Sequence, residues 1–443
     1  MTAACQAAVW SFSDEQAAEG LVFADGLRAL FLPPPAVASS AGQQPPTLLQ
    51  LLPTDLLSIV LSHLDTSDLA RLAATCRFFW RDVPTSPPRP MPLLRPMGPV
   101  ETELRRRLTA RGLRIVPSLP KAALSWVPYL LKRVLRDALW REAPLAAGDN
   151  FSVFVDEGGR LQTCGSENTE DGGEFLLGHA VDPEADPDAL RSIGPPTLVP
   201  SMQDKRIVSV AASQWHCLAL SCDGEVYSWG DGDFGSLGHT DNGARAVPSR
   251  IESLSRVESI AAGHDRTSAA VDGDGRLFTW GPATAPTHSG GTMPTGLGYA
   301  HDSQTESQLT PKWVEAFSED RVVGVSLGRG FTLAVTDAGA IFSFGWSRHG
   351  ALGHGSFEAE VVPRRIETLQ GRQFVAVAPG SFHALALTEE GELYGWGNAK
   401  SNGHGRDELT PQRVTAFIGQ PVKHVHSGGY SSCAVTEKGK LYT

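Results

Sequence analysis

The chain has 443 residues, enough for two or three domains, and its 41% hydrophobic and 20% charged residues are typical of a globular protein. The formal net charge of -11 argues against a surface devoted to nucleic acid, and no stretch approaches the length of a membrane-spanning helix. The first residues lack the basic and apolar parts of a signal peptide, and the six Cys residues are scattered, so we expect free thiols and a cytoplasmic and/or nuclear location.

Composition divides the chain into five parts. Residues 1–47 are rich in Pro, Ala, Ser and Gln and are predicted to be a flexible leader. Residues 48–83 have a helical pattern, residues 84–100 form a Pro-rich linker, and residues 101–146 return to helical composition. From 147 to 443, short β-type runs alternate with Gly-rich turns. We therefore predict a small helical domain followed by an all-β domain.

The first helical segment opens with Leu52-Pro53, and Pro is well placed in the first turn of a helix. Apolar residues then recur at helical spacing, and Asp65 or Ser67 can cap a second amphipathic helix. The basic residues between Arg105 and Arg141 could form a nucleic-acid arm. We favour the alternative that they coat the outer face of helices that link two domains.

The second half of the chain repeats one unit. "HCLALSCDGEVYSWG", "TSAAVDGDGRLFTWG" and "HALALTEEGELYGWG" begin at His216, Thr267 and His383, and two further copies begin at Phe151 and Phe331. Each copy is followed by a Leu-Gly-His-like element, then a Pro, then another apolar strand. The Gly in the turn of each hairpin is expected to supply a positive φ.

Such a unit cannot bury its own apolar face, so neighbouring units must stack. Four strands in each unit of roughly 50 residues favour the blade of a β-propeller over a solenoid. The last residues, "EKGKLYT" from Glu437 to Thr443, match the start of a sixth copy. We therefore predict five full repeats plus the start of a sixth, that is, an incomplete ring cut short by a truncated gene model or expressed fragment.

The repeat resembles that of the regulator-of-chromosome-condensation family, which implies a propeller with seven blades. The segment "LLPTDLLSIVLSHLDTSDLARLAATCRFFWRDV" resembles an F-box, whose signature is Leu-Pro opening a helix, then Leu-x-x-Asp-Leu, then Cys-Arg and a Trp. Leu52-Pro53, Arg77 and Trp80 stand where this signature expects them. Phe78 and Phe79 stand between Cys76-Arg77 and Trp80, which adds one aromatic residue to the usual short spacing. The two resemblances together indicate a chain like the fungal-type F-box/propeller proteins that act with the SCF ubiquitin ligase.

An F-box implies a partner, the small Skp adaptor of a cullin–RING ubiquitin ligase, which would bury an apolar stripe. The alternative is that the same residues only pack a small helical core. The candidate adaptor-binding residues are Leu52, Pro53, Leu56, Leu57, Ile59, Val60, Leu64, Leu69, Cys76 and Trp80.

Propellers usually bind partners through loops that differ between blades. The loop residues that we predict to contact a protein substrate are Asp233, Phe234, Trp346, Arg348 and His349. The histidines of the Leu-Gly-His elements belong to different units and cannot converge on one ion, so we interpret them as structural hydrogen-bonding groups. "DGDG" at 272–275 is interpreted as a hairpin turn and not as a calcium loop. We expect no metal, no cofactor and no membrane or nucleic-acid partner.

No P-loop, nucleophile elbow or metalloprotease helix is present in the sequence, so we expect a non-catalytic protein. The preferred hypothesis is a substrate-recognition subunit of an SCF-type ligase that directs a bound protein to degradation. The alternatives are a guanine-nucleotide exchange factor for a small GTPase, as the propeller family suggests, and a protein-interaction scaffold without ligase contact.

Overall fold

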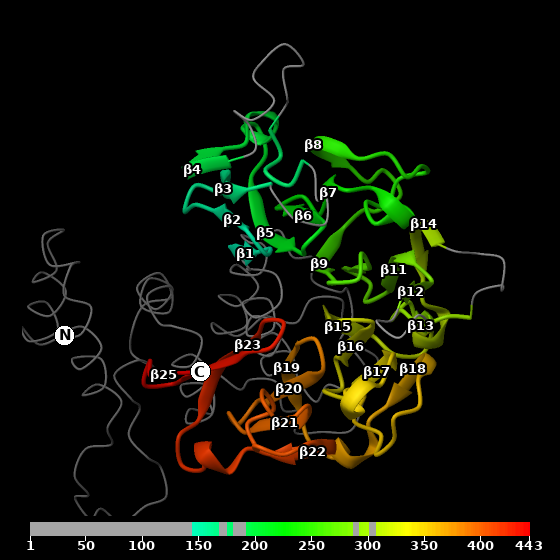
Figure 1. The fold of residues 1–443 in the computed structure, drawn as a ribbon, viewed down its shortest axis with the longest axis vertical. Helices are drawn as coiled ribbons and strands as arrows, with labels where there is room; N and C mark the ends of the chain where they lie inside the picture. Colours follow the sequence, from blue (N-terminus) through cyan, green and yellow to red (C-terminus); the bar gives the residue numbers. More distant parts are fainter. Residues whose placement is uncertain (1–143, 168–174, 180–191, 287–291, 301–306) are drawn as a thin grey trace, which may run out of the picture. The chain divides into compact units, whose positions relative to one another are not determined.

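The computed structural model describes residues 144–167, 175–179, 192–286, 292–300 and 307–443. In them the chain forms a six-bladed β-propeller, as the repeats predict (Figure 1). Five blades are antiparallel sheets of four strands, and the sixth has three. The predicted five full repeats plus the start of a sixth are thereby confirmed. The predicted F-box helices lie outside the described residues, and the expectation of seven blades stays a prediction.

The strands follow the chain in order around the propeller. Blade 1 contains β1 (Leu145–Ala147), β2 (Phe151–Val155), β3 (Leu161–Ser166) and β4 (Ser192–Leu198); blade 2 contains β5 (Ile207–Ala212), β6 (His216–Ser221), β7 (Val226–Gly230) and β8 (Arg245–Arg250). Blade 3 contains β9 (Val257–Ala262), β10 (Ser268–Asp272), β11 (Leu277–Pro282) and β14 (Ser307–Trp313), with a separate hairpin of β12 (Thr284–Pro286) and β13 (Thr292–Pro294). Blade 4 contains β15 (Val322–Leu327), β16 (Phe331–Thr336), β17 (Ile341–Gly345) and β18 (Glu360–Arg365).

The last two blades continue the same pattern. Blade 5 contains β19 (Phe374–Pro379), β20 (His383–Thr388), β21 (Leu393–Gly397) and β22 (Glu408–Arg413); blade 6 contains β23 (Val422–Ser427), β24 (Ser432–Thr436) and β25 (Leu441–Tyr442). The helices in the described part are six short 3-10 turns: η4 (Pro200–Met202), η5 (Asp233–Gly235), η6 (Glu315–Phe317), η7 (Arg348–Gly350), η8 (Glu367–Leu369) and η9 (Thr415–Phe417). None of the described helices is long and apolar enough to cross a membrane.

The sequence repeat is offset from the blade. The repeat begins on the second strand of one sheet, and its last apolar strand becomes the first strand of the next sheet. These first strands (β1, β5, β9, β15, β19 and β23) lie towards the centre of the propeller (Figure 1). Each covalent link from a fourth strand to the following first strand therefore joins two neighbouring blades.

The outermost strand of blades 2 to 5 contains one Pro of the repeat: Pro248, Pro311, Pro363 and Pro411. Pro lacks a backbone N–H, so it suits an edge strand and blocks further strand pairing there. Blade 1 differs, because Pro200 begins the η4 turn, while Pro195 and Pro196 occupy its outer strand.

Buried aromatic side chains fill the junctions between blades. Trp229, Trp280 and Trp396 stand at one column of the repeat, are fully buried, and pack against the preceding blade. Phe344 occupies this column in blade 4. This column therefore packs neighbouring blades together. Clusters of buried side chains join each blade to the next from blade 1 to blade 6.

A single carbonyl oxygen marks each of these junctions. Ser236 O accepts hydrogen bonds from Trp280 Nε1 and from Ser268 Oγ, both at 2.9 Å and both from the next blade. The equivalent carbonyls, which also directly precede the Leu-Gly-His-like element, accept from Trp229 Nε1, Thr332 Oγ1, Trp396 Nε1 and Ser432 Oγ. We call this group the junction carbonyl. The hydrogen bonds to it satisfy a buried backbone acceptor and fix one blade against the next.

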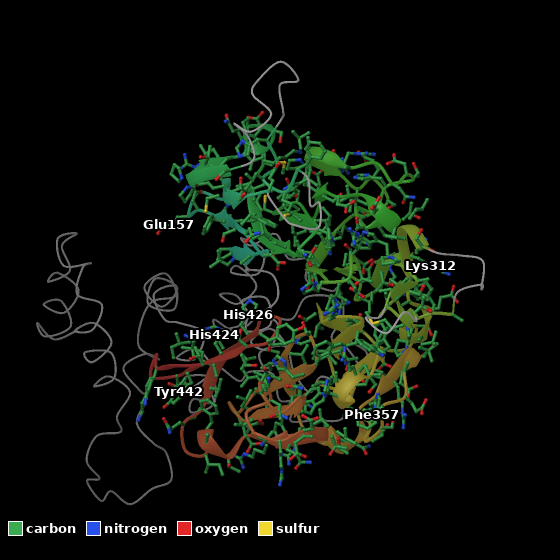
Figure 2. All side chains as sticks on the ribbon, in the orientation of Figure 1. Glu157, Lys312, Phe357, His424, His426 and Tyr442 are labelled. Carbon is green, nitrogen blue, oxygen red and sulfur yellow. The ribbon has the colours of Figure 1, made fainter. Side chains whose placement is uncertain are left out.

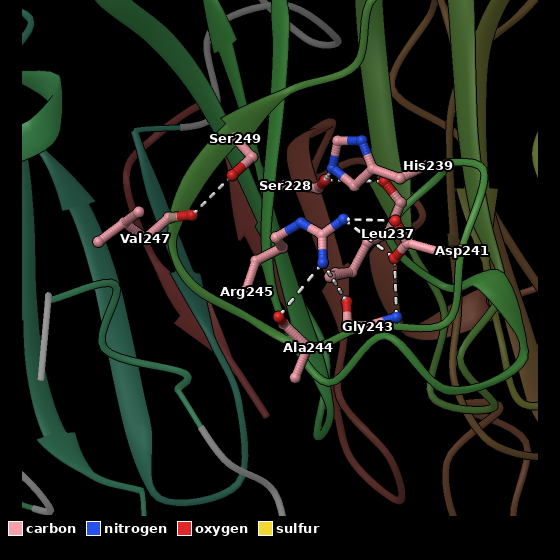
Figure 3. Close-up of polar contacts among 9 residues, drawn as sticks. All are labelled: Ser228, Leu237, His239, Asp241, Gly243, Ala244, Arg245, Val247 and Ser249. Atoms are coloured by element: carbon pink, nitrogen blue, oxygen red, sulfur yellow. Dashed lines mark hydrogen bonds and ion pairs between the residues drawn. The ribbon is translucent and has the colours of Figure 1, made fainter. Parts of the chain in front are cut away.

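The Leu-Gly-His element is itself held inside its own blade (Figure 3). Ser228 Oγ donates to Leu237 O at 2.7 Å and lies 3.1 Å from His239 Nε2. Because the hydroxyl proton is directed at the carbonyl, the imidazole nitrogen is the donor to the hydroxyl oxygen. Thr163 with His179 and Ser343 with His354 repeat the arrangement. These histidines are structural hydrogen-bonding groups, as predicted.

Blade 6 is less buried than the others. Its first strand carries His424 and His426 as exposed side chains (Figure 2). The matching positions of blade 5 are Ala376 and Ala378, which pack in the cluster between blades 5 and 6. Within the described part of the chain, no such cluster joins blade 6 to blade 1.

Two histidines are buried where the second strand begins. His216 Nε2 lies 2.7 Å from Ser268 Oγ and its Nδ1 lies 3.0 Å from Ser213 Oγ. His383 Nε2 lies 2.8 Å from Ser432 Oγ of blade 6. Burial lowers the pKa of both imidazoles to about 4, so both are neutral at pH 7.

We predict that Trp280→Phe lowers the free energy of unfolding of the intact chain by roughly 1–2 kcal/mol, because it removes one donor to the junction carbonyl and some ring volume. Trp313→Phe is the matched control. Trp313 Nε1 is buried and has no partner among the described residues, so its loss should cost little. The measurement is urea unfolding followed by circular dichroism. Equal losses in the two variants would contradict the role of the junction carbonyl.

We predict that the chain loses stability as the pH falls from about 6.5 towards 4. The folded pKa of His216 lies below the ordinary value, so the unfolded chain takes up protons first, at a cost of up to roughly 3 kcal/mol for each such histidine. His216→Phe copies Phe151 and Phe331 at the same repeat position and should flatten the dependence of the urea midpoint on pH. Unchanged pH dependence in this variant would exclude His216 as its source.

Candidate protein-binding rim

One face of the propeller consists of the loops between the first and second strands and the loops that follow the third strands. The strand registers place these loops at the same end of each sheet. We call this face the loop rim. All five predicted substrate contacts lie in its third-strand loops, on blade 2 (Asp233, Phe234) and blade 4 (Trp346, Arg348, His349).

Phe382, in the loop between β19 and β20, is the centre of an aromatic and basic group on the rim. The ring centroids of Trp346, His349 and Tyr430 lie 6.1, 5.6 and 5.8 Å from that of Phe382. The guanidinium carbons of Arg348 and Arg329 lie 4.8 and 5.8 Å from the same centroid. We call Phe382, Trp346, Arg348, His349 and Tyr430 the Phe382 cluster. It draws on blades 4, 5 and 6.

The three predicted residues of blade 4 therefore come together. Phe382 is only 8% exposed, whereas Tyr430 is 69% exposed and Arg348 is also exposed. The cluster thus has a buried ring beneath and accessible aromatic and cationic groups above. This composition is common in the energetically important part of protein–protein interfaces.

Arg348 holds its charge against two ring faces, at 4.8 Å from the Phe382 centroid and 5.5 Å from that of Trp346. Each such cation–π contact contributes about 0.5–1 kcal/mol at an exposed site. No described carboxylate lies within ion-pair distance of this guanidinium, although most other described arginines have one. Arg348 is therefore oriented but has no counter-charge in this part of the chain.

His349 shapes the loop tip through an unusual backbone. Its φ of 55° and ψ of 19° lie in the left-handed region, which costs a non-Gly residue roughly 1 kcal/mol. This geometry turns the imidazole towards Phe382, and Nδ1 lies 3.4 Å from Asp407 Oδ2 of the next blade. Phe234 has the same left-handed conformation at the equivalent point of blade 2. Such strain often marks functional loops.

Phe234 belongs to a second group, around Arg266. The Arg266 guanidinium stacks on the Trp215 ring at 3.6 Å, lies 5.9 Å from Phe234, and forms an ion pair with Asp231 at 2.9 Å. Five residues separate the last paired residues of β9 and β10 (Ala262 and Ser268), where four separate those of β5 and β6 (Ala212 and Cys217). Arg266, in this longer loop, has a φ of 68°. Asp233 is exposed, and its backbone N–H donates to Asp231 Oδ1.

The two groups differ in the state of their arginine. Arg266 is half-buried, paired with Asp231 and stacked on Trp215, so its charge is already used within the protein. Arg348 is exposed and has no described carboxylate partner. We therefore take the Phe382 cluster as the candidate binding surface and the Arg266 group as its structural neighbour on the rim.

Sequence reasoning missed Phe382, Tyr430, Trp215 and Arg266. Phe382 and Trp215 directly precede the second strands of their blades, and Arg266 and Tyr430 directly precede Thr267 and Ser431, which hold the equivalent position of the repeat. This column contains Asn150, Trp215, Arg266, Gly330, Phe382 and Tyr430. The sequence signal for these residues was the presence of large side chains in a Gly-rich loop. Such loops need no apolar side chains for their own folding, so large ones there indicate a surface contact.

The ten candidate adaptor-binding residues, from Leu52 to Trp80, lie outside the described residues. Within the described ranges, no three His, Cys, Asp or Glu side chains are placed to hold a metal ion. The 272–275 turn is part of the β10–β11 hairpin, where Asp272 pairs with Arg276.

Family models match both halves of the chain. A model of the Regulator of chromosome condensation (RCC1) repeat matches residues 223–270 and 338–387, and a second RCC1 repeat model matches residues 207–236 and 374–406. An F-box-like model matches residues 49–83. These matches fall on the segments that carry the two resemblances in the sequence.

Among curated proteins, the chain is 36% identical to human E3 ubiquitin-protein ligase HERC2 over 260 residues, which is 56% of this chain and 5% of the relative. It is 35% identical to the Ultraviolet-B receptor UVR8 of Arabidopsis thaliana, over 46% of this chain and 43% of the relative. The chain thus spans less than half the length of either relative.

Among solved structures, Prp20p from Saccharomyces cerevisiae matches with a TM-score of 0.55 at 23% identity, over 66% of this chain and 67% of that one. Human WBSCR16 matches with a TM-score of 0.53 at 22% identity, over 66% and 71%. These two likenesses show the fold. The chain therefore combines an F-box-like segment with a β-propeller of RCC1 repeats.

Proposed function

We propose that this protein is the substrate-recognition subunit of an SCF-type cullin–RING ubiquitin ligase. The observation that carries the proposal is the F-box-like match at 49–83 in the same chain as a propeller with an exposed aromatic and basic rim. The first part would dock the Skp adaptor, and through it cullin and RING subunits. The second would hold the protein to be ubiquitylated.

The subunit would act without catalytic groups of its own. Binding a target to the same chain that docks the ligase raises the effective concentration of target lysines near the ubiquitin carrier. A rigid propeller suits this task, because the buried junctions hold its rim loops in one arrangement. HERC2, a relative of the propeller, is named as an E3 ubiquitin-protein ligase, which agrees in class with this role.

The adaptor-binding half of the proposal rests on apolar spacing. Leu56 and Val60 stand four residues apart, and Ile59 and Leu52 extend the same stripe in the sequence. An apolar stripe of this kind is buried when an amphipathic helix enters a partner's groove. A charged residue in the stripe would lose its hydration without gaining a partner, which weakens binding strongly.

The second candidate function is nucleotide exchange on a small GTPase. The solved structure of Prp20p, which has the same fold, is described together with its binding to Gsp1p and histones. This alternative leaves the F-box-like segment without a role. Faster nucleotide release from a small GTPase in the presence of the purified chain would favour it over the ligase function.

We predict that the intact chain binds the purified Skp adaptor and that Leu56→Asp together with Val60→Asp lowers the affinity at least about tenfold, because the interface would bury unpaired charge. Ile418→Asp is the control, since Ile418 is an exposed apolar residue of the propeller. Isothermal titration with the adaptor is the measurement. The ligase function is excluded if the unaltered chain does not bind, or if the double variant binds as tightly as the control.

A further inference from the structure

We infer that the Phe382 cluster binds an acidic peptide segment of the target, with an Asp or Glu carboxylate on Arg348 and an adjacent apolar side chain on Trp346 and Tyr430. The inference rests on the proposed function, because it takes the loop rim as the target-binding face. It adds the chemical class of the segment that the rim recognises.

The cationic half of this surface is Arg348. Its guanidinium is permanently charged and offers planar donors that match a carboxylate in a bidentate pair. Stacking on Phe382 and Trp346 limits the orientations of the guanidinium, so less conformational entropy is lost when a carboxylate binds. The carboxylate of Asp407, which belongs to the same surface, interacts with His349 Nδ1 and with the Ala399 backbone N–H instead.

The apolar half consists of aromatic faces around a buried ring. Tyr430 is 69% exposed and lies 5.8 Å from Phe382, and Trp346 is half-buried on the other side. Trp, Tyr and Arg are the residues that most often dominate binding energy at protein interfaces. An aliphatic or aromatic side chain next to the acidic residue would cover these faces.

A peptide fits this surface better than a nucleic acid does. Phosphate backbones are held by several cations along their length, and binding strength follows the number of phosphates neutralised. The carboxylates of Asp231, Asp233 and Asp407 are interspersed with the arginines of the loop rim, and the whole chain carries a net charge of -11. Arg348 and Arg329 beside the Phe382 ring suit a short acidic motif rather than a long run of phosphates.

The test is a selection of short random peptides displayed on phage against the immobilised intact chain. We expect enrichment of motifs that place Asp or Glu beside an aromatic or aliphatic residue. The selection repeated on Arg348→Ala should lose this enrichment. Selection of motifs without an acidic residue, or of none, would overturn the inference.

The selected consensus peptide then gives a quantitative test by fluorescence anisotropy. Arg348→Ala should weaken its binding at least about tenfold, and Arg348→Lys should also weaken it, since Lys keeps the charge but not the planar, stacked donor group. Arg406→Ala is the matched control. Arg406 is 80% exposed on the same rim and pairs with Glu408, so its loss should leave affinity within about twofold.

Three results would contradict the inference: equal losses from Arg348→Ala and Arg406→Ala, full affinity for the peptide with its Asp and Glu changed to Asn and Gln, or displacement of the peptide by single-stranded DNA at equal concentration. Adaptor titration of Arg348→Ala separates the two proposals. Unchanged adaptor binding with lost peptide binding supports both the ligase function and the peptide site. Failure of the unaltered chain to bind the adaptor contradicts the ligase function alone.

Discussion

The arrangement of the blades depends on the hydrogen bonds that each junction carbonyl accepts from the next blade. This carbonyl lies at the residue before each Leu-Gly-His-like element, so one backbone group accepts hydrogen bonds from the next blade while its neighbour is held by its own blade. A buried acceptor without these donors would cost about 1–3 kcal/mol. The donors vary between junctions, but at least one is present at each junction between successive described blades.

This anchoring leaves the adjacent loop tips free to differ. In blade 2 the residues before the anchored element include Asp231 and Phe234, and in blade 4 they include Trp346 and Arg348. Because the element that follows each tip is held by its own blade, the tips can carry aromatic and charged groups suited to a partner. The left-handed backbone at Phe234 and His349 is energetically unfavourable, and the surrounding hydrogen-bonded framework holds it in place.

Much of the propeller is predictable from one sequence because each blade repeats the same physical problem. Strand alternation and a turn Gly recur in all five full copies, and a buried aromatic residue recurs in four of them, so a wrong interpretation of one copy is corrected by the others. Gly224 and Gly391, for example, have a φ of 80° as the hairpins require. The Phe382 cluster is different, because its five residues come from three blades and only Trp346, Arg348 and His349 are close in sequence. No local pattern indicates that Tyr430 meets Phe382, since that contact depends on how blades 5 and 6 pack.

In the proposed function, one chain joins an adaptor to a target through separate surfaces. The most direct measurement is the binding of the selected acidic peptide to the intact chain, with and without saturating Skp adaptor. We expect the adaptor to bind the chain and to leave the affinity for the peptide unchanged within about twofold, so that all three components elute together in gel filtration. Competition between peptide and adaptor, or a chain that binds the peptide but never the adaptor, would contradict the account.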